Sequence, residues 1–369
     1  MEYMQYGMVG GGPDGNIGNA HRKALRLSGA AVLCAGCFSR HEDKNLQMAE
    51  QLGVVPERCY KSYAEMAYAE SHRPDGIRFV VVVTPNSSHY EICRCFLEAG
   101  IAVACDKPLT IELEQAEELK QLAEARGLPF MVTYTYTGHH MFQRMRALIA
   151  SGGIGKIRKV MAEYPQSWLA DEHSDGGKQG QWRMDPKQSG GTNCLGDIGS
   201  HVENAVAALT GLKLTRVLAM MNTVVPGRVL DDDDVVLTQY SDGTTGAYWV
   251  SQFAFGHDND LRVRVYGSEG SCEWGLAEPT RLTVFDAHNH CTILTPQPED
   301  VPLYGRYEAG SEYEPWNIAM SNLYLQFIEN VRKPELPANY PTAAAGVACM
   351  RFIRACMESS SRNNVWVNV

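Results

Sequence analysis

Short apolar segments alternate with helical stretches through the first 135 residues, and this alternation constrains the fold more than any other feature of the chain. Segments such as Phe79–Val83 and Gly100–Ala104 are almost entirely apolar, as strands buried on both faces are. The expected strands, separated by helical patterns, lie at residues 6–9, 30–38, 79–83, 101–104 and 130–133. This βαβ rhythm predicts an α/β domain with a doubly wound parallel sheet.

A second pattern begins after about residue 215, where strand follows strand. The expected strands lie at residues 216–222, 235–240, 246–255, 261–266, 271–274 and 281–285. Turn signals such as Ser241-Asp242-Gly243 separate them and favour a large, open, mostly antiparallel sheet. The tail from Trp316 reads as two helices around Lys333-Pro334-Glu335. We expect two domains, at residues 1–135 and 136–369, the second of α+β class, with C-terminal helices that can pack back on the first.

Net charge and hydropathy limit the classes of partner that the protein can bind. A net charge of -10 disfavours nucleic acid and anionic membrane surfaces. No charge-free apolar run approaches the roughly 20 residues that a membrane span needs, and no basic-then-apolar signal pattern opens the chain, so we expect a cytoplasmic protein.

Eleven cysteines lie mostly within strand or helix patterns, so we expect reduced thiols. Cys34 and Cys37 form a C-x-x-C in an apolar run with no second metal pair, and a strand interior is the favoured interpretation.

A glycine-rich loop follows the first strand: Gly10-Gly11-Gly12-Pro13-Asp14-Gly15-Asn16-Ile17-Gly18. Gly10, Gly12 and Gly15 match the G-x-G-x-x-G spacing that lets a backbone approach a pyrophosphate at a helix N-terminus. Pro13 and Asp14 delay the expected helix to near Ile17, which would make Gly18 the glycine of close packing. The alternative is a plain glycine turn. The position between strand and helix favours a Rossmann dinucleotide-binding domain.

Three further loops follow expected strands of this domain. At the position where an acidic residue often binds the adenosine ribose, the chain has Ser39 and Arg40. Arg40 could pair with a 2'-phosphate, so NADP stays open beside NAD, and the alternative is an ordinary solvated turn. The turn from Thr84 to His89 is either a simple helix cap or a cofactor contact. Lys107 comes directly after a strand, at the edge where such sheets bind ligands.

In the second half, Asp197 and His201 lie four residues apart, where an expected helix begins. Such a pair shares one helix face, so the carboxylate can orient the imidazole of a general base. The alternatives are a purely structural histidine and a metal ligand. The pair falls short of a catalytic zinc set, and we expect no metal. The run Asp231–Asp234 lacks calcium-ligand spacing and is expected to form a solvated loop or to oppose a basic partner in an oligomer.

These motifs, in this order, resemble the Gfo/Idh/MocA family of nicotinamide-dependent sugar and polyol oxidoreductases. The resemblance covers nearly the whole chain. It rests on the glycine loop, Thr84-Pro85-Asn86 with His89, the lysine motif with Asp106 in place of the more frequent glutamate, Gly153-Ile154-Gly155-Lys156-Ile157, and Asp197 with His201. The triple glycine, the segment Trp182-Arg183-Met184-Asp185-Pro186 and Leu230-Asp231-Asp232-Asp233-Asp234 look closest to the branch of levoglucosan-dehydrogenase-like enzymes that oxidise pyranosides at C3.

The resemblance implies NAD(H)-dependent oxidation of a secondary hydroxyl, with Lys107, Asp197 and His201 as catalytic residues. It implies cofactor contacts from Gly10, Gly12, Asn16, Ile17, Ser39, Arg40, Thr84, Pro85, Asn86, His89, Asp106 and Lys107. Hydrogen-bonding and aromatic groups suited to a sugar are Tyr134, Tyr136, Trp168, Trp182, Arg183 and Asn193, although the tryptophans could equally pack a hinge.

We expect a glucoside or related pyranose as substrate and a homo-oligomer formed through the C-terminal sheet. The alternatives are an inositol or polyol dehydrogenase, a glycoside-cleaving enzyme that reduces and reoxidises a tightly held NAD within each turnover, and a non-catalytic nucleotide sensor. The last is disfavoured because a sensor needs no base.

Overall fold

The computed structural model describes residues 3–13, 15–171, 184–297 and 315–369. The chain divides into two compact units. Unit 1 comprises Met1–Gly138 and Trp316–Val347, and unit 2 comprises His139–Pro315 and Ala348–Val369. Trp182 and Arg183, two of the expected sugar contacts, lie outside the described residues.

Unit 1 is built on a five-stranded, wholly parallel sheet of order β2-β1-β3-β4-β5. The strands are β1 (Met4–Gly10), β2 (Ala31–Cys37), β3 (Phe79–Val83), β4 (Ala102–Cys105) and β5 (Phe130–Val132). The helices are α1 (Asn16–Ser28), α2 (Glu42–Leu52), α3 (Tyr63–Ser71), α4 (His89–Glu98), α5 (Leu113–Arg126) and α11 (Pro315–Arg332). Single-turn 3-10 helices occupy Pro56–Arg58, Asn86–Ser88 and Thr135–Gly138. The predicted doubly wound parallel sheet is confirmed.

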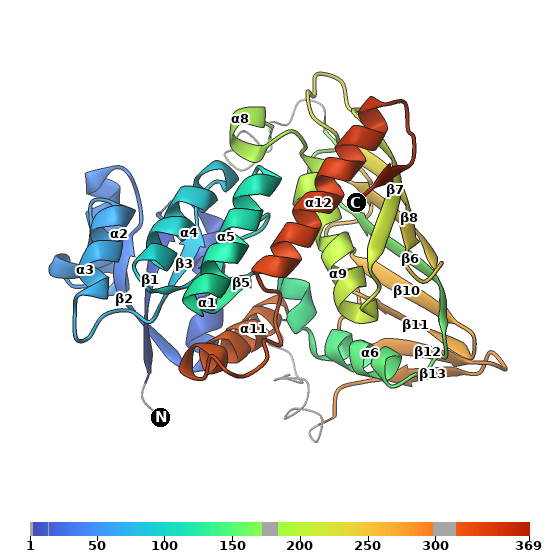
Figure 1. The fold of residues 1–369 in the computed structure, drawn as a ribbon, viewed down its shortest axis with the longest axis horizontal. Coiled ribbons are helices and arrows are strands. Elements are labelled where there is room, and N and C mark those ends of the chain that lie inside the picture. Colours follow the sequence, from blue (N-terminus) through green and yellow to red (C-terminus); the bar gives the residue numbers. More distant parts are fainter. Residues whose placement is uncertain (1–2, 14, 172–183, 298–314) are drawn as a thin grey trace. The chain divides into compact units, whose positions relative to one another are not determined.

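The core of unit 1 forms where α1, α2 and α11 pack on one side of this sheet (Figure 1). Phe79 of β3 is fully buried and meets the α11 ring of Phe327 edge-on, with 5.3 Å between ring centroids. Helix α11 buries an apolar face made of Met320, Leu323, Tyr324, Phe327, Ile328 and Val331. A helix nearly two hundred residues beyond β5 thus completes the hydrophobic core of this unit.

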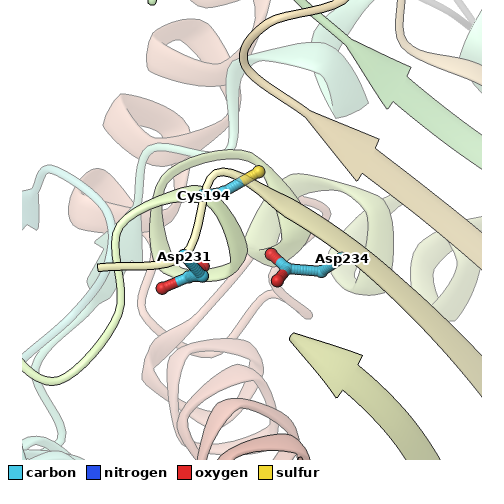
Figure 2. Close-up of side chains that lie close together, drawn as sticks. All are labelled: Cys194, Asp231 and Asp234. Atoms are coloured by element: carbon cyan, nitrogen blue, oxygen red, sulfur yellow. The ribbon is translucent and has the colours of Figure 1, made fainter. Parts of the chain in front are cut away.

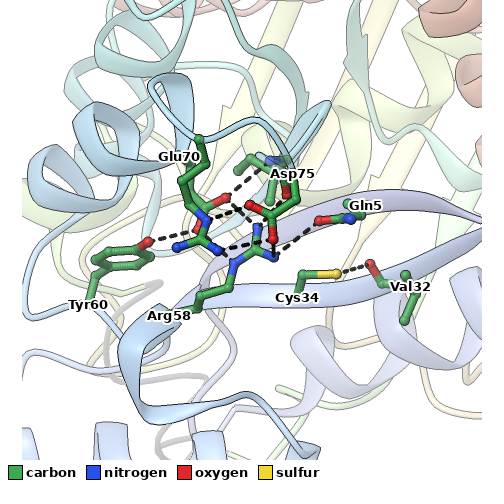
Figure 3. Close-up of polar contacts among 9 residues, drawn as sticks. Gln5, Val32, Cys34, Arg58, Tyr60, Glu70 and Asp75 are labelled. Carbon is green, nitrogen blue, oxygen red and sulfur yellow. Dashed lines mark hydrogen bonds and ion pairs between the residues drawn. The ribbon is translucent and has the colours of Figure 1, made fainter.

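A buried ion pair joins α3 to the single-turn helix Pro56–Arg58, which follows α2 (Figure 3). The guanidinium of Arg58 binds both carboxylate oxygens of Glu70, with Nε to Oε1 at 2.9 Å. Glu70 also accepts from the Tyr60 hydroxyl at 2.8 Å and from the Ile77 backbone N–H at 3.1 Å, and Arg58 donates to Gln5 of β1 at 3.1 Å. Both charges are nine-tenths or more buried, so their contacts must replace the water they lose.

Unit 2 contains a nine-stranded sheet of order β13-β12-β11-β10-β6-β9-β8-β7-β14 (Figure 1). Only the β6–β9 pair is parallel among these, so the expected mostly antiparallel sheet is confirmed. The strands are β6 (Ile157–Pro165), β7 (Leu214–Asn222), β8 (Asp233–Tyr240), β9 (Thr245–Ser251), β10 (Arg262–Gly267), β11 (Gly270–Gly275), β12 (Leu282–Asp286), β13 (Cys291–Leu294) and β14 (Val367–Asn368).

Helices cover one face of this sheet. They are α6 (His140–Ala150), α9 (Ser200–Thr210) and the part of α12 (Ala343–Ser361) that belongs to unit 2, while the short α8 (Pro186–Ser189) precedes the segment leading to α9. Along β8, side chains alternate between the covered face, with Val236 and Tyr240 buried, and the opposite face, where Leu237 is 41% exposed. The period of two is the signature of a sheet with one covered face.

All eleven cysteines are free thiols, as expected, and six of them are buried. Cys34 and Cys37 lie in β2, which agrees with the strand interpretation of the C-x-x-C. Within the residues that the structure describes, we find no helix long and apolar enough to cross a membrane.

Candidate active site

The loop after β1 approaches its neighbours so closely that only glycine fits. Gly10 has a φ of +88°, and a Cβ there would lie 2.6 Å from the Val83 carbonyl oxygen. A Cβ on Gly12 would lie 2.9 Å from the Phe38 carbonyl oxygen, and one on Gly18 would lie 2.4 Å from Gly11 Cα. Helix α1 begins at Asn16, next to the predicted Ile17, and Gly18, the third residue of the helix, packs against Gly11 of the loop. This bare backbone before a helix N-terminus fits a dinucleotide pyrophosphate.

Two more turns reach the same sheet edge, because the strand register aligns the carboxyl ends. Gly10 pairs with Val83, and Val82 pairs with Cys105, so the glycine loop, the turn at Thr84–Asn86 and the Asp106–Lys107 turn are neighbours. The sheet order reverses between β1 and β3, and open α/β sheets bind ligands at such a switch point. The predicted clustering of cofactor residues at this edge follows from the register.

His89 and Asp106 hold these turns together. The two ring nitrogens of His89 lie 2.9 Å from the Thr84 carbonyl oxygen and 3.0 Å from that of Pro108. Burial lowers the pKa of His89, so the neutral ring donates to one of the two oxygens. Asp106 Oδ1 accepts from the Lys107 backbone N–H at 3.0 Å and from the Thr133 hydroxyl at 2.9 Å. Both residues, expected as cofactor contacts, thereby fix the turn that carries Lys107.

At the end of β2, the backbone is fixed by a buried amide. Asn45 of α2 accepts from the Phe38 N–H at 2.7 Å and donates to the Tyr60 carbonyl oxygen at 2.8 Å. Ser39 follows, with its hydroxyl accepting from the His41 N–H at 3.1 Å, and Arg40 is exposed. This position leaves Arg40 able to meet an adenosine ribose or its phosphate. Tyr134 and Tyr136, after β5, are buried in unit 1.

Unit 2 carries its own group of candidate residues, where a π-helical turn spans Leu195–Gly199 and continues into α9. Such turns are rare and frequently occur at functional sites. Asp197 lies in the π-turn and His201 in the first turn of α9, so a helical segment begins in this region as expected. His201 is 8% exposed and meets the Tyr164 ring of β6 edge-on, with 6.1 Å between ring centroids. Trp168, an expected sugar contact, is half-buried in the same unit.

Asp231 fixes the start of this helical segment. Its carboxylate accepts from the Asn193 N–H at 2.8 Å, from the Leu195 N–H at 2.7 Å and from the Thr192 hydroxyl at 2.8 Å. It therefore satisfies backbone donors that a helix N-terminus leaves unpaired. The expectation of a solvated acidic loop is wrong: Asp231, Asp232 and Asp234 are 6% exposed or less. Asp231 and Asp232 are buried because their carboxylates accept from backbone N–H groups, and no pattern in the sequence indicates those donors.

Cys194, Asp231 and Asp234 lie close enough to offer three ligands to one metal ion (Figure 2). Burial, with the Asp231 charge beside it, raises the pKa of Asp234 well above its usual range, and burial likewise raises that of Cys194. Protonated Asp234 and Cys194, together with the three hydrogen-bond donors to Asp231, explain how these groups lie close together without a metal ion. We assign it no metal.

Sequence reasoning missed Gln252, which follows β9 and whose side-chain Nε2 donates to Asp197 Oδ2 at 3.2 Å. No local motif surrounds Gln252, and only the fold brings it to a residue 55 positions earlier in the chain. Asn193, expected to contact sugar, donates its amide N–H to Gln252 Oε1 at 2.6 Å. Lys107 belongs to unit 1, whereas Asn193, Asp197 and His201 belong to unit 2.

Comparisons with known proteins agree with the fold. Residues 4–134 match the model of an oxidoreductase family with an NAD-binding Rossmann fold, and residues 142–273 match the GFO/IDH/MocA C-terminal domain. The uncharacterized oxidoreductase YfiI of Bacillus subtilis is 34% identical over 99% of this chain and 96% of its own length. Levoglucosan dehydrogenase of Pseudarthrobacter phenanthrenivorans is 29% identical over 57% of this chain and 58% of its own.

A crystal structure of an inositol dehydrogenase homolog from Azotobacter vinelandii, complexed with NAD+, is 33% identical and superposes with a TM-score of 0.94, covering 100% of this chain and 98% of that one. A second structure under that description, with NADH and myo-inositol, is 32% identical with a TM-score of 0.91, over the same shares of the two chains.

The glycine loop and these matches define an oxidoreductase whose first unit is an NAD-binding Rossmann domain. The chain belongs to the Gfo/Idh/MocA family of oxidoreductases.

Proposed function

We propose that this protein oxidises a secondary hydroxyl of a polyhydroxylated six-membered ring, with NAD as hydride acceptor. The observation that carries the proposal is the placement of Asp197 in a π-turn and of His201 four residues later in the first turn of α9, with the Gln252 amide bound to Asp197. An imidazole beside a carboxylate is suited to accept a proton, and amides suit the recognition of several hydroxyls.

The proposed division of labour follows from the charge that alcohol oxidation develops. NAD, which the loop at Gly10, Gly12 and Gly18 would hold, would supply the acceptor for the hydride that leaves carbon. In this proposal, Lys107 donates to the reacting oxygen and stabilises its alkoxide charge, and His201 takes the proton. Asp197 orients the imidazole and stabilises its protonated form. Asp106 and His89 hold the turn that presents Lys107.

Two substrate classes are supported by different observations. The segment Leu230–Asp234 and the triple glycine favour a pyranoside oxidised at C3, by resemblance to that branch of the family. The full-length match to an inositol dehydrogenase homolog favours a cyclitol. Both offer a ring of secondary hydroxyls. We put the pyranoside first, with Trp168, Tyr134 and Tyr136 as its proposed contacts, and the cyclitol second.

The roles of the catalytic residues are tested by His201→Asn and Lys107→Met. Each is expected to lower kcat by about a hundredfold or more, because each removes a proton acceptor or a charged donor from the transition state. Affinity for NADH, measured by fluorescence titration, should stay within a few-fold for His201→Asn. Unchanged kcat in His201→Asn would contradict the assignment of the base.

A glycoside-cleaving reaction with internal redox cycling would use the same first step. It differs in its products: sugar and aglycone would appear without net NADH. Product analysis beside the absorbance of NADH therefore separates the two reactions.

We also propose that the open face of the nine-stranded sheet joins copies of this chain. Met220, Leu237, Tyr266 and Ile293 are 41–47% exposed. The strand registers place them on one face, opposite the helices. The same face carries the ion-paired Arg262, Arg264, Glu163 and Glu273, and exposed apolar side chains beside charged ones on an uncovered face favour association. Leu237→Arg should reduce the molar mass measured by light scattering, whereas Leu27→Arg on α1 makes the same change on unit 1 and should not. A monomeric parent protein would contradict this proposal.

A further inference from the structure

Gln252 lies at the centre of a chain of amide hydrogen bonds that ends on Asp197. Its side chain is fully buried. Oε1 accepts from Asn193 Nδ2 at 2.6 Å, and Nε2 donates to Asp197 Oδ2 at 3.2 Å. The Gln252 backbone is held on both sides, since its N–H donates to the Asp232 carbonyl oxygen at 2.9 Å and its carbonyl oxygen accepts from the Leu169 N–H at 3.0 Å.

The orientation of the Asn193 and Gln252 amides is set by Asp231, at the other end of this chain of hydrogen bonds. Asn193 Nδ2 also lies 3.4 Å from the Asp231 carbonyl oxygen, which can only accept, so the NH2 group of Asn193 must face that side. In this orientation Asn193 donates to Gln252, so the atom of Gln252 that faces Asn193 must be its side-chain carbonyl oxygen. Its NH2 group is then left for Asp197. The Asn193 backbone is itself fixed by the Asp231 carboxylate at 2.8 Å.

We propose that Gln252 is a positioning residue, which holds one carboxylate oxygen of Asp197 in place through an amide chain anchored at Asp231 and Asn193. The inference rests on the proposed function, in which Asp197 orients His201. A terminal carboxylate rotates in a broad torsional well, and one directed donor narrows that rotation. The same donor favours the ionised carboxylate, the form that stabilises a protonated imidazole.

Gln252→Glu is the first test, because it keeps the shape and the acceptor toward Asn193 but replaces the donor toward Asp197. We expect kcat to fall about tenfold or more, the loss that one hydrogen bond to a charged group supports, with KM for NAD little changed. Gln252→Met, which removes both polar atoms without adding a charge, should lower kcat in the same direction. Gln239→Glu makes the same chemical change on β8 and should leave kcat within about twofold.

A double-mutant cycle separates positioning from general structural support. In an Asp197→Asn background, measured by single-turnover formation of NADH, Gln252→Glu should cost less than about twofold, because the carboxylate on which it acts is gone. Equal losses in both backgrounds, or unchanged kcat in the parent background, would overturn the positioning role. Unchanged kcat in Asp197→Asn alone would instead overturn the proposed function.

Discussion

Glu203, two residues after His201 on α9, provides a quantitative test of the unit 2 core. Its side chain is 5% exposed, and Oε2 has no hydrogen-bond partner among the described residues. Burial raises the pKa of this carboxyl from 4.5 to about 8. In the folded protein the group is therefore neutral at pH 7, whereas in the unfolded chain it is ionised.

The direction in which stability changes with pH follows from the raised pKa of the Glu203 carboxyl. Below pH 4.5 both states are protonated and Glu203 imposes no penalty. As pH rises from 4.5 toward 8, the unfolded state gains from ionisation and the folded state does not, so stability is lost in that window. At about 1.36 kcal/mol per pKa unit, the penalty is about 3 kcal/mol at pH 7 and about 5 kcal/mol above pH 8.

Glu203→Gln removes this penalty, because the amide does not ionise. Equilibrium urea unfolding, followed by tryptophan fluorescence, should show the variant gaining on the parent by about 3–4 kcal/mol between pH 5 and pH 8. Any cost of burying the new NH2 group is the same at both pH values and cancels in this comparison. The exposed Glu269→Gln, in the same unit, should show no such gain. A stability difference between Glu203→Gln and parent that is constant from pH 5 to pH 8 would refute the reasoning.

Two further predictions concern unit 1. Gly18→Ala should weaken NADH binding about tenfold or more in a fluorescence titration, because the new Cβ would lie 2.4 Å from Gly11 Cα. Gly15→Ala, whose Cβ would keep ordinary contacts, should leave the affinity for NADH unchanged. Equal affinities in the two variants would contradict the role of Gly18. Glu70→Leu should lower the free energy of unfolding by about 3–5 kcal/mol, because Arg58 is left buried without its partner. Adding Arg58→Met to the Glu70→Leu variant should restore much of this loss. Additive losses from the two substitutions would show that the ion pair is not the cause.

Much of unit 1 could be predicted because local signals and tertiary structure agree there. Buried parallel strands such as β3 are continuous apolar runs, and β3 was predicted to the residue, at Phe79–Val83. The glycine loop and the lysine turn follow strand ends, where topology alone places ligands. Helix α3, at Tyr63–Ser71, was missed because its apolar residues show little helical periodicity.

The residues that support the candidate site were harder to predict. Asp231 and Gln252 lie 34 and 55 positions after Asp197 and act through contacts that only the folded sheet creates. Four consecutive aspartates look solvated in a sequence, since nothing in the local pattern shows the backbone donors of residues 193 and 195. The helical segment that carries Asp197 and His201 could be predicted from the apolar periodicity that follows it, whereas the pairing of the two side chains stays a prediction.

The most direct test of the central claim is the near-ultraviolet absorbance of NADH, followed with purified protein, NAD or NADP, and a panel of O- and C-glucosides, free hexoses and inositols. We predict that NADH forms with glucosides, that the keto product is reduced back to the parent sugar, and that His201→Asn abolishes both. NADH formation with inositols alone would move the substrate to the cyclitol class. No reduced nucleotide and no altered sugar with any member of the panel would contradict the assignment of this protein as a ring-hydroxyl dehydrogenase.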